Sequence, residues 1–360
     1  MIRAFSFLLP ILLVVGNLLG WSNKEHIQLT RIAAQQLILD PDTPPAMKDW
    51  LKKGIAGGPQ MLEEEKEYLL HKHVGLWPRG VDGLPFWAVM PDLIGMIDRD
   101  KPLEKFGVSE QKLHYIDVEL FMPAGAQQYA ADLSHKPALK DFPRDKNDAR
   151  YKEAGMLPFA VEHAYGELVR CLKANRLDDR DGQLPRDDHA TRWAGYLAHY
   201  LQDNTQPHHA TEDYQSRSYF PNVKDPKKTP RVHGDIEYRL VDDDEHDYAD
   251  LREEFASIIV SAMQDVDDPA KAEDLWTQTL EIALFSYDAL PLIGKAAVAA
   301  YPNAGENGPG KFDANAFFHF KGQCMGREMS VLEMKARQQA LAMKRTQTVW
   351  LRAWNEAHRR

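Results

Sequence analysis

The chain of 360 residues contains only two cysteines, Cys171 and Cys324, and neither belongs to a Cys-x-x-Cys pair. A zinc site made of thiolates is therefore not expected, because such sites take their ligands from closely spaced cysteines. The two thiols could pair if the protein is exported, but their spacing gives no argument for a disulfide. A chain of this size does not need one to be stable.

The sequence also lacks an excess of positive charge. It has 54 acidic and 44 basic side chains, and its formal net charge is −10 at pH 7. This balance argues against a broad nucleic-acid-binding surface, which normally needs a basic face. A small pocket that contacts one or two nucleotides is still compatible with it, because bound metal ions would supply positive charge.

No segment alternates convincingly between apolar and polar residues, and no internal repeat is present. Apolar residues instead recur at three- and four-residue steps, the spacing of an amphipathic helix. The sequence therefore predicts an all-α protein, in which Asp187 and Asp188 cap the central helix. The expected helices cover residues 27–39, 158–174, 189–203, 251–263, 272–290 and 329–357.

The one long apolar run lies at the N-terminus. Residues 1–20 carry a single charge, on Arg3, and end in a small residue. This pattern predicts a secretory signal peptide that is cleaved before Trp21, so that the mature protein is secreted or periplasmic. Leu18 occupies a position where a smaller residue is usual, and an uncleaved membrane anchor is the alternative interpretation.

Residues 302–310 are rich in Gly, Pro and Asn and are the best candidate linker. They would separate a main domain, residues 21–301, from a C-terminal segment, residues 311–360. Residues 321–360 hold nine Lys or Arg against three Glu, a net charge of +6, and include Trp350 and Trp354. This helix could make a peripheral contact with an anionic membrane or with nucleic acid, or it could pack its Trp face against the body. Nothing implies a protein partner.

The most informative motif is His199-x3-Asp203-x5-His209, which is followed by His233-x3-Glu237. Residues four apart on a helix point the same way, so each pair can direct an imidazole and a carboxylate into one cavity. Mixed sets of His, Asp and Glu suit zinc.

Further candidate ligands lie nearer the N-terminus. Cleavage before Trp21 would free an α-amino group with a pKa of about 7.7 to 8.0, which can bind zinc together with its own carbonyl oxygen, and His26 is close in sequence. Asp92 follows an apolar segment that Pro91 is expected to hold extended. His114 stands in the run Leu-His-Tyr-Ile-Asp.

With these residues the chain resembles the superfamily that unites bacterial zinc-dependent phospholipases C with the single-strand-specific nucleases of fungi and plants. The resemblance runs from Trp21 to about Leu240, and a weaker helical similarity continues to about residue 300. The family spacing selects His209 and passes over the neighbouring His208. The nine motif positions are filled, in the family's order, by Trp21, His26, Asp92, His114, His199, Asp203, His209, His233 and Glu237.

The resemblance implies a mostly helical domain around three zinc ions. The first ion would be held by Asp92, His114, His199 and Asp203, the second by His209, His233 and Glu237, and the third by Trp21, His26 and Asp203. A zinc-bound hydroxide would then attack phosphorus in a phosphodiester. Asp92 is the candidate catalytic residue, as the general base.

Two substrate classes compete. The His-Tyr-Ile-Asp run is similar to the nuclease pattern, in which the aromatic residue, here Tyr115, stacks on a base and the acid, here Asp117, hydrogen-bonds it. Glu237 and the approach to Asp92 are closer to phospholipases, and Gly95 stands where nucleases carry an arginine. The sequence narrowly favours a phospholipase C-like enzyme over a single-strand nuclease or 3′-nucleotidase. A non-catalytic, exported zinc-binding protein is the alternative outside enzymology.

Overall fold

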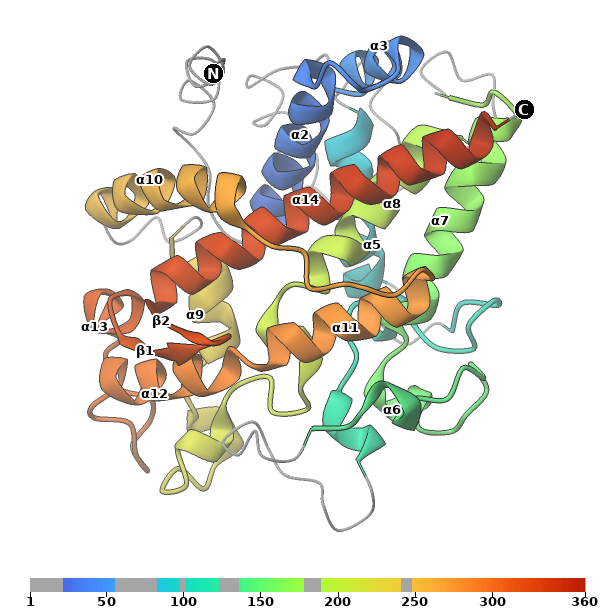
Figure 1. Cartoon of the computed structure of the whole chain (residues 1–360). Coiled ribbons are helices and arrows are strands. Elements are labelled where there is room, and N and C mark those ends of the chain that lie inside the picture. The colour runs from blue at the N-terminus through green and yellow to red at the C-terminus, as the bar shows by residue number, and fades with distance from the viewer. Residues whose placement is uncertain are drawn as a thin grey trace.

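The computed structural model describes residues 22–55, 83–97, 102–122, 136–177, 189–240 and 248–359. The predicted signal peptide and Trp21 lie outside these residues. The fold is mostly helical, as expected (Figure 1). Its α-helices are α2 (Asn23–Leu39), α3 (Pro45–Gly54), α5 (Gly83–Ile97), α6 (Tyr151–Ala154), α7 (Leu157–Lys173), α8 (Ala190–Asp203), α9 (Val232–Tyr238), α10 (Ala249–Asp265), α11 (Leu275–Tyr287), α12 (Leu290–Ala300), α13 (Ala314–Phe318) and α14 (Val331–Ala357).

Short 3₁₀ helices fill several of the connections. They are η2 (Glu110–Leu113), η3 (Val118–Phe121), η4 (Leu139–Asp141), η5 (Pro207–Ala210), η6 (Arg217–Tyr219) and η7 (Pro226–Lys228). Two of them adjoin candidate ligands, because His114 follows η2 and His209 lies within η5.

Each of the six helices expected from periodicity is present, but two local predictions were wrong. The cap of α8 is His189, whose Nδ1 accepts a hydrogen bond from the backbone N–H of Arg192, and not an aspartate. Pro91 lies inside α5 and is not extended. The preference of a residue before proline for extended backbone is overridden there, because Asp92 is the one charged residue of α5 and residues 84–91 are buried in the fold.

One short β-hairpin departs from the all-α expectation. Strand β1 (Lys321–Cys324) pairs antiparallel with β2 (Arg327–Ser330), and Met325 and Gly326 form the turn with positive φ angles of 52° and 83°. Two-residue turns of this conformation match the twist of antiparallel strands. Four-residue strands are too short to show a period-two pattern in the sequence.

The core consists of two apolar clusters that share helix α14. The first half of α14 packs in one cluster with α9, α10, α12 and α13, and its end packs in the other cluster with α5, α7, α8 and α11. Figure 1 shows α14 running across the whole molecule, from the hairpin to the side of α7. The C-terminal segment therefore shares its core with the body of the protein.

The tryptophans of α14 face this core. Trp350 is buried and its Nε1 donates a hydrogen bond to the Ala194 carbonyl oxygen at 3.1 Å, and Trp354 stacks on Trp50 at 5.8 Å between ring centroids. Any contact of this segment with a membrane or nucleic acid would thus use other side chains. Cys171 and Cys324 are both buried free thiols.

The apolar stretch Leu275–Ala300, which spans α11 and α12, is long enough to cross a membrane. However, 61% of its most apolar window is buried inside the fold. Its packing is that of core helices in the body of the protein.

Candidate metal centre

The close approach of α5 and α8 builds the base of the site. Gly195 in α8 lies directly against Trp87 in α5, and a Cβ atom at Gly195 would be 2.4 Å from the Cβ of Trp87. One turn further along α8, His199 Nδ1 lies 2.7 Å from the Ala88 carbonyl oxygen. Because a carbonyl only accepts, Nδ1 carries the proton and Nε2 presents its lone pair to the interior.

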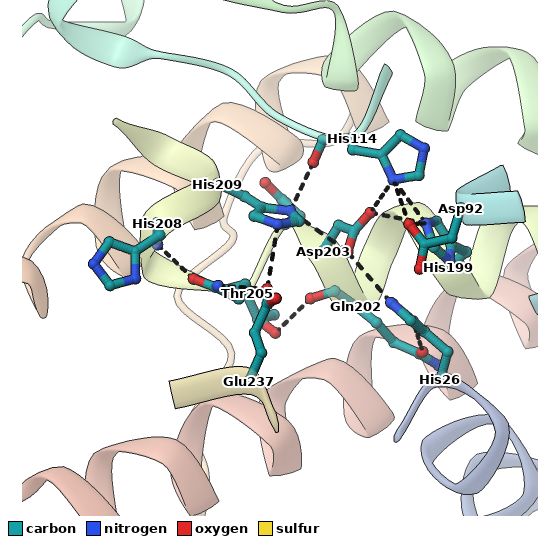
Figure 2. Close-up of polar contacts among 12 residues, drawn as sticks. His26, Asp92, His114, His199, Gln202, Asp203, Thr205, His208, His209 and Glu237 are labelled. Carbon is teal, nitrogen blue, oxygen red and sulfur yellow. Dashed lines mark hydrogen bonds and ion pairs between the residues drawn. The ribbon is translucent and has the colours of Figure 1, made fainter. Parts of the chain in front are cut away.

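The side chains of Asp92 in α5, His114 after η2 and Asp203 at the end of α8 converge beside that nitrogen (Figure 2). His114 Nδ1 lies 2.9 Å from His199 Nε2, 3.0 Å from Asp203 Oδ2 and 3.4 Å from Asp92 Oδ1. His199 Nε2 lies 3.0 Å from Asp203 Oδ2 and 3.8 Å from Asp92 Oδ1. These are the four residues that the family resemblance assigns to one ion.

The spacing of these four atoms is compatible with the ligands of a single metal ion. Ligand atoms at the usual zinc distances of about 2.0 to 2.2 Å are about 3.3 Å from one another, and the five distances here range from 2.9 to 3.8 Å. A water molecule at the centre of such a set would sit too close to all four atoms, because hydrogen bonds require about 2.7 Å or more.

His26, in the first full turn of α2, brings a third imidazole to Asp203. Its Nε2 lies 3.4 Å from Asp203 Oδ1, and its Nδ1 lies 2.7 Å from the amide oxygen of Gln202. The ring stacks on that of His199 at 4.1 Å between centroids. The two oxygens of Asp203 thus face different imidazoles, Oδ2 toward His114 and His199 and Oδ1 toward His26 and His209.

A further group forms where η5 meets α9. Glu237 Oε1 lies 2.6 Å from His233 Nε2 and 3.5 Å from His209 Nε2. His209 Nδ1 in turn lies 3.0 Å from the main-chain oxygen of His114 and 3.5 Å from Asp203 Oδ1. The Nε2 atom of His209 therefore faces Glu237, while its Nδ1 is directed at the His114 carbonyl oxygen, which is how the second nitrogen of a metal-binding imidazole is usually held.

Within the described part of the chain, three groups of side chains could hold a metal ion, with ligand atoms in each no more than 4.8 Å apart. The groups join every predicted ligand except Trp21, which lies outside that part. They comprise His26, His199 and Asp203; Asp92, His114 and His199; and His209, His233 and Glu237.

The charges of the site are strongly coupled. Burial opposes protonation of His26 and His209, but the Asp203 carboxylate outweighs it and raises the pKa of each imidazole to about 9. Burial would also raise the pKa of Asp203, yet His199 and His209 hold that pKa well below its ordinary value. Without a metal the Asp203 carboxylate is therefore ionised, and positive charge lies on His26 and His209.

His208 does not belong to the site. Its Nε2 lies 3.0 Å from the Ser216 hydroxyl, and its ring points away from Asp203 (Figure 2). Burial lowers the pKa of His208 well below its usual value, so the imidazole is neutral. The selection of His209 over His208 as the ligand agrees with this geometry.

Tyr115 and Asp117 lie next to the centre but outside its ligand groups. The Tyr115 ring is half-buried, with the Lys112 ammonium 5.3 Å from its centroid. Burial, together with the charge of Glu119, raises the pKa of Asp117 to about 8. The Asp117 carboxyl group is thus mostly protonated at neutral pH and can donate as well as accept a hydrogen bond.

Sequence reasoning missed two amides that orient the ligands. The Oε1 atom of Gln202 accepts a hydrogen bond from His26 Nδ1, and its Nε2 donates one to Thr30 Oγ1 at 3.0 Å. Gln206 donates from Nε2 to Glu237 Oε1 at 2.7 Å. Both glutamines occur in the stretch 199–209, but only the fold reveals which ligand each one contacts.

Comparison of the chain with protein-family models, with curated proteins and with solved structures finds no match.

Proposed function

We propose that this protein is a zinc-dependent hydrolase of phosphodiester bonds, a member of the superfamily of zinc phospholipases C and single-strand-specific nucleases. The observation that carries the proposal is the arrangement around Asp203, whose two oxygens face separate groups of imidazoles. A carboxylate placed in this way can bridge two metal ions. When bound, zinc ions lower the pKa of water to about 7 and neutralise charge on phosphoryl oxygens.

Asp92 is suited to the role of general base. Its side chain is 33% exposed, whereas those of His199 and Asp203 are almost completely buried. Among the four clustered side chains, the Asp92 carboxylate is thus the one best placed to receive a proton from a water molecule that enters from solvent. His114 and His199 each have one ring nitrogen within 4 Å of this carboxylate and would hold it in place.

For the substrate we retain a phospholipase C-like activity as the first candidate, on the basis of Glu237 and the sequence leading to Asp92. Tyr115 and Asp117 support a single-strand nuclease as the second. Their segment is rigid: Leu157 donates its N–H to the Tyr115 carbonyl oxygen at 3.2 Å, and a Cβ atom at Gly155 would be 2.2 Å from that oxygen. A fixed aromatic ring beside a protonated carboxyl group is suited to holding a nucleobase.

A direct comparison of substrates tests the proposal. The purified protein is assayed against phosphatidylcholine vesicles and against single-stranded DNA and RNA, in its native form, after treatment with a chelator, and after return of zinc. We expect turnover that disappears with the chelator and returns with zinc. Nuclease turnover without lipid cleavage would replace the first candidate by the second.

The variant Asp92→Asn distinguishes a zinc enzyme from a protein that binds zinc without catalysis. As an enzyme, the variant should keep most of its zinc and lose hydrolysis, because the amide cannot accept the proton. A wild-type protein that binds zinc but cleaves none of the phosphodiesters tried would favour an exported zinc-binding protein.

Export and the N-terminal ligand are tested together. We expect amino-terminal sequencing of the protein recovered outside the cytoplasm to begin at Trp21, and metal analysis to give about three zinc ions per chain. A different first residue would remove the α-amino group from the proposed ligand set.

A further inference from the structure

A fully buried ammonium group lies behind the metal centre. Lys335, in α14, has no exposed surface. Its Nζ donates a hydrogen bond to the main-chain oxygen of Ile236 in α9 and lies 3.2 Å from Glu25 Oε1 in α2. Ile236 immediately precedes the ligand Glu237, and Glu25 immediately precedes the ligand His26. One side chain of the C-terminal helix thus contacts the neighbours of two ligands.

Glu25 also contacts Gln339 in α14 and Ser22, the first described residue of the chain. Its Oε1 also accepts a hydrogen bond from Gln339 Nε2 at 3.0 Å, and its Oε2 accepts one from the backbone N–H of Ser22. Ser22 follows Trp21, so the carboxylate fixes the backbone beside the proposed N-terminal ligand. The first turn of α2 is therefore attached to α14 at two points, Lys335 and Gln339.

Stability alone does not explain a buried ion pair in this place. Removing two charges from water is costly, and replacing a buried pair by apolar side chains of similar volume is often neutral or stabilising. The pair does hold two segments in a fixed arrangement. The Lys335 ammonium group contacts the Glu25 carboxylate in α2 and the Ile236 carbonyl oxygen in α9.

We infer that Lys335 and Glu25 are positioning residues of the metal centre, which set the distance between the His26 segment and the Glu237 segment. This inference rests on the proposed metal cluster. It makes the C-terminal segment, which lies beyond the stretch that resembles the family, a part of the site. Neither residue contacts the substrate or the reacting atoms.

The test measures how fast zinc leaves the folded protein. Wild type, Lys335→Met and the double variant Glu25→Gln/Lys335→Met are loaded with zinc, and its transfer to a chromogenic chelator is followed over time. We expect at least ~10-fold faster release from both variants, since residues that orient ligands typically contribute 10- to 100-fold to metal affinity.

Arg345→Met is the matched control. Arg345 is also buried in α14 and also forms an ion pair, at 3.0 Å with Asp268, but it lies away from the ligands. We expect this variant to lower the melting temperature of the metal-free protein and to release zinc at the wild-type rate.

The double variant distinguishes the loss of the positioning contacts from the destabilising effect of a buried group that has lost its partner. Lys335→Met alone leaves the ionisable Glu25 carboxyl group buried without its cation, whereas the double variant leaves neither ionisable group. We expect it to regain the melting temperature of the metal-free wild type while its zinc release stays fast. If Lys335→Met does not fold, the double variant alone carries the comparison.

The outcomes for the metal cluster and for the positioning role are distinct. A wild-type protein that binds no zinc would overturn the proposed function itself. If wild type retains zinc and the double variant retains it equally well, the cluster stands and the positioning role of Lys335 and Glu25 is wrong. That role is also wrong if Arg345→Met releases zinc as fast as Lys335→Met.

Discussion

Gly195 and Trp87 are packed so closely that no side chain fits between them: a Cβ atom on Gly195 would lie 2.4 Å from the Trp87 Cβ and 2.7 Å from its carbonyl carbon. This contact sets the distance between α8 and α5, and hence the distance of His199 from Ala88 and Asp92.

Gly195→Ala should therefore damage the metal centre from a distance. The added methyl group must push α5 and α8 apart, at a cost of about 1 to 3 kcal/mol in folding free energy, and separate His199 from Asp92. We expect a lower midpoint in denaturant-induced unfolding and weaker zinc binding in a chelator competition.

The control for this variant is Gly166→Ala in α7. A Cβ atom there would meet nothing within 4 Å, so the better helix propensity of alanine should stabilise the protein by up to about 1 kcal/mol. Zinc binding should not change. Equal zinc affinity in the two variants would contradict the role given to the close contact.

Asp203→Asn should affect more than one ion. Its Oδ2 faces His114 and His199 and its Oδ1 faces His26 and His209, so loss of its charge weakens coordination on both sides of the carboxylate, whereas Glu237→Gln acts on the one group that it forms with His209 and His233. After dialysis, elemental analysis should show less zinc per chain for Asp203→Asn than for Glu237→Gln. Loss of the same amount from both variants would mean that Asp203 does not bridge.

Adjacent histidines offer a sharp comparison. His209→Asn removes a proposed ligand, and we expect it to lower the zinc content by about one equivalent. His208→Asn removes the hydrogen bond to Ser216 and the stacking of the His208 ring on His233, and we expect it to cost about 1 kcal/mol of folding free energy with no loss of zinc. A larger zinc loss from the His208 variant would reverse the ligand assignment.

Zinc binding should release protons at neutral pH. In the metal-free protein the pKa of His26 and that of His209 are about 9, because burial is outweighed by Asp203. Both imidazoles are therefore protonated at pH 7, and a metal can bind them only after displacing those protons.

The direction of the pH dependence of zinc binding follows from the raised pKa of His26 and His209. Apparent zinc affinity should fall as the pH decreases below 9, and proton release should vanish above that value. Titration calorimetry at pH 7 in two buffers of different ionisation enthalpy measures the number of protons. A result of zero would show that the imidazoles are already neutral without metal.

The sequence predicted the helices well, because each buries one apolar face and so repeats at a helical period. It also predicted that His199 would lie beside Asp203 and His233 beside Glu237, since each pair occurs at helical spacing, and both pairs are in contact in the structure. Their role as metal ligands stays a prediction. The position of Trp21 and the presence of zinc stay predictions.

Features that depend on long-range packing could not be predicted. Nothing local in the sequence indicates that Pro91 continues a helix, because the burial of α5 among other helices outweighs its own preference. The partner of Lys335 is equally hidden, since Glu25 is far away along the chain and a lysine in an amphipathic helix ordinarily faces solvent.

The hydrogen bond between Glu25 and Gln339 joins positions 314 residues apart. Contacts between residues so distant in sequence form slowly, so this one should form late in folding. During synthesis or export, the segment that carries His26 cannot form its contacts with α14 until nearly the entire chain is available. A truncated product would thus lack a finished metal centre, and the hydrolytic activity proposed here would begin only after the last helix has folded.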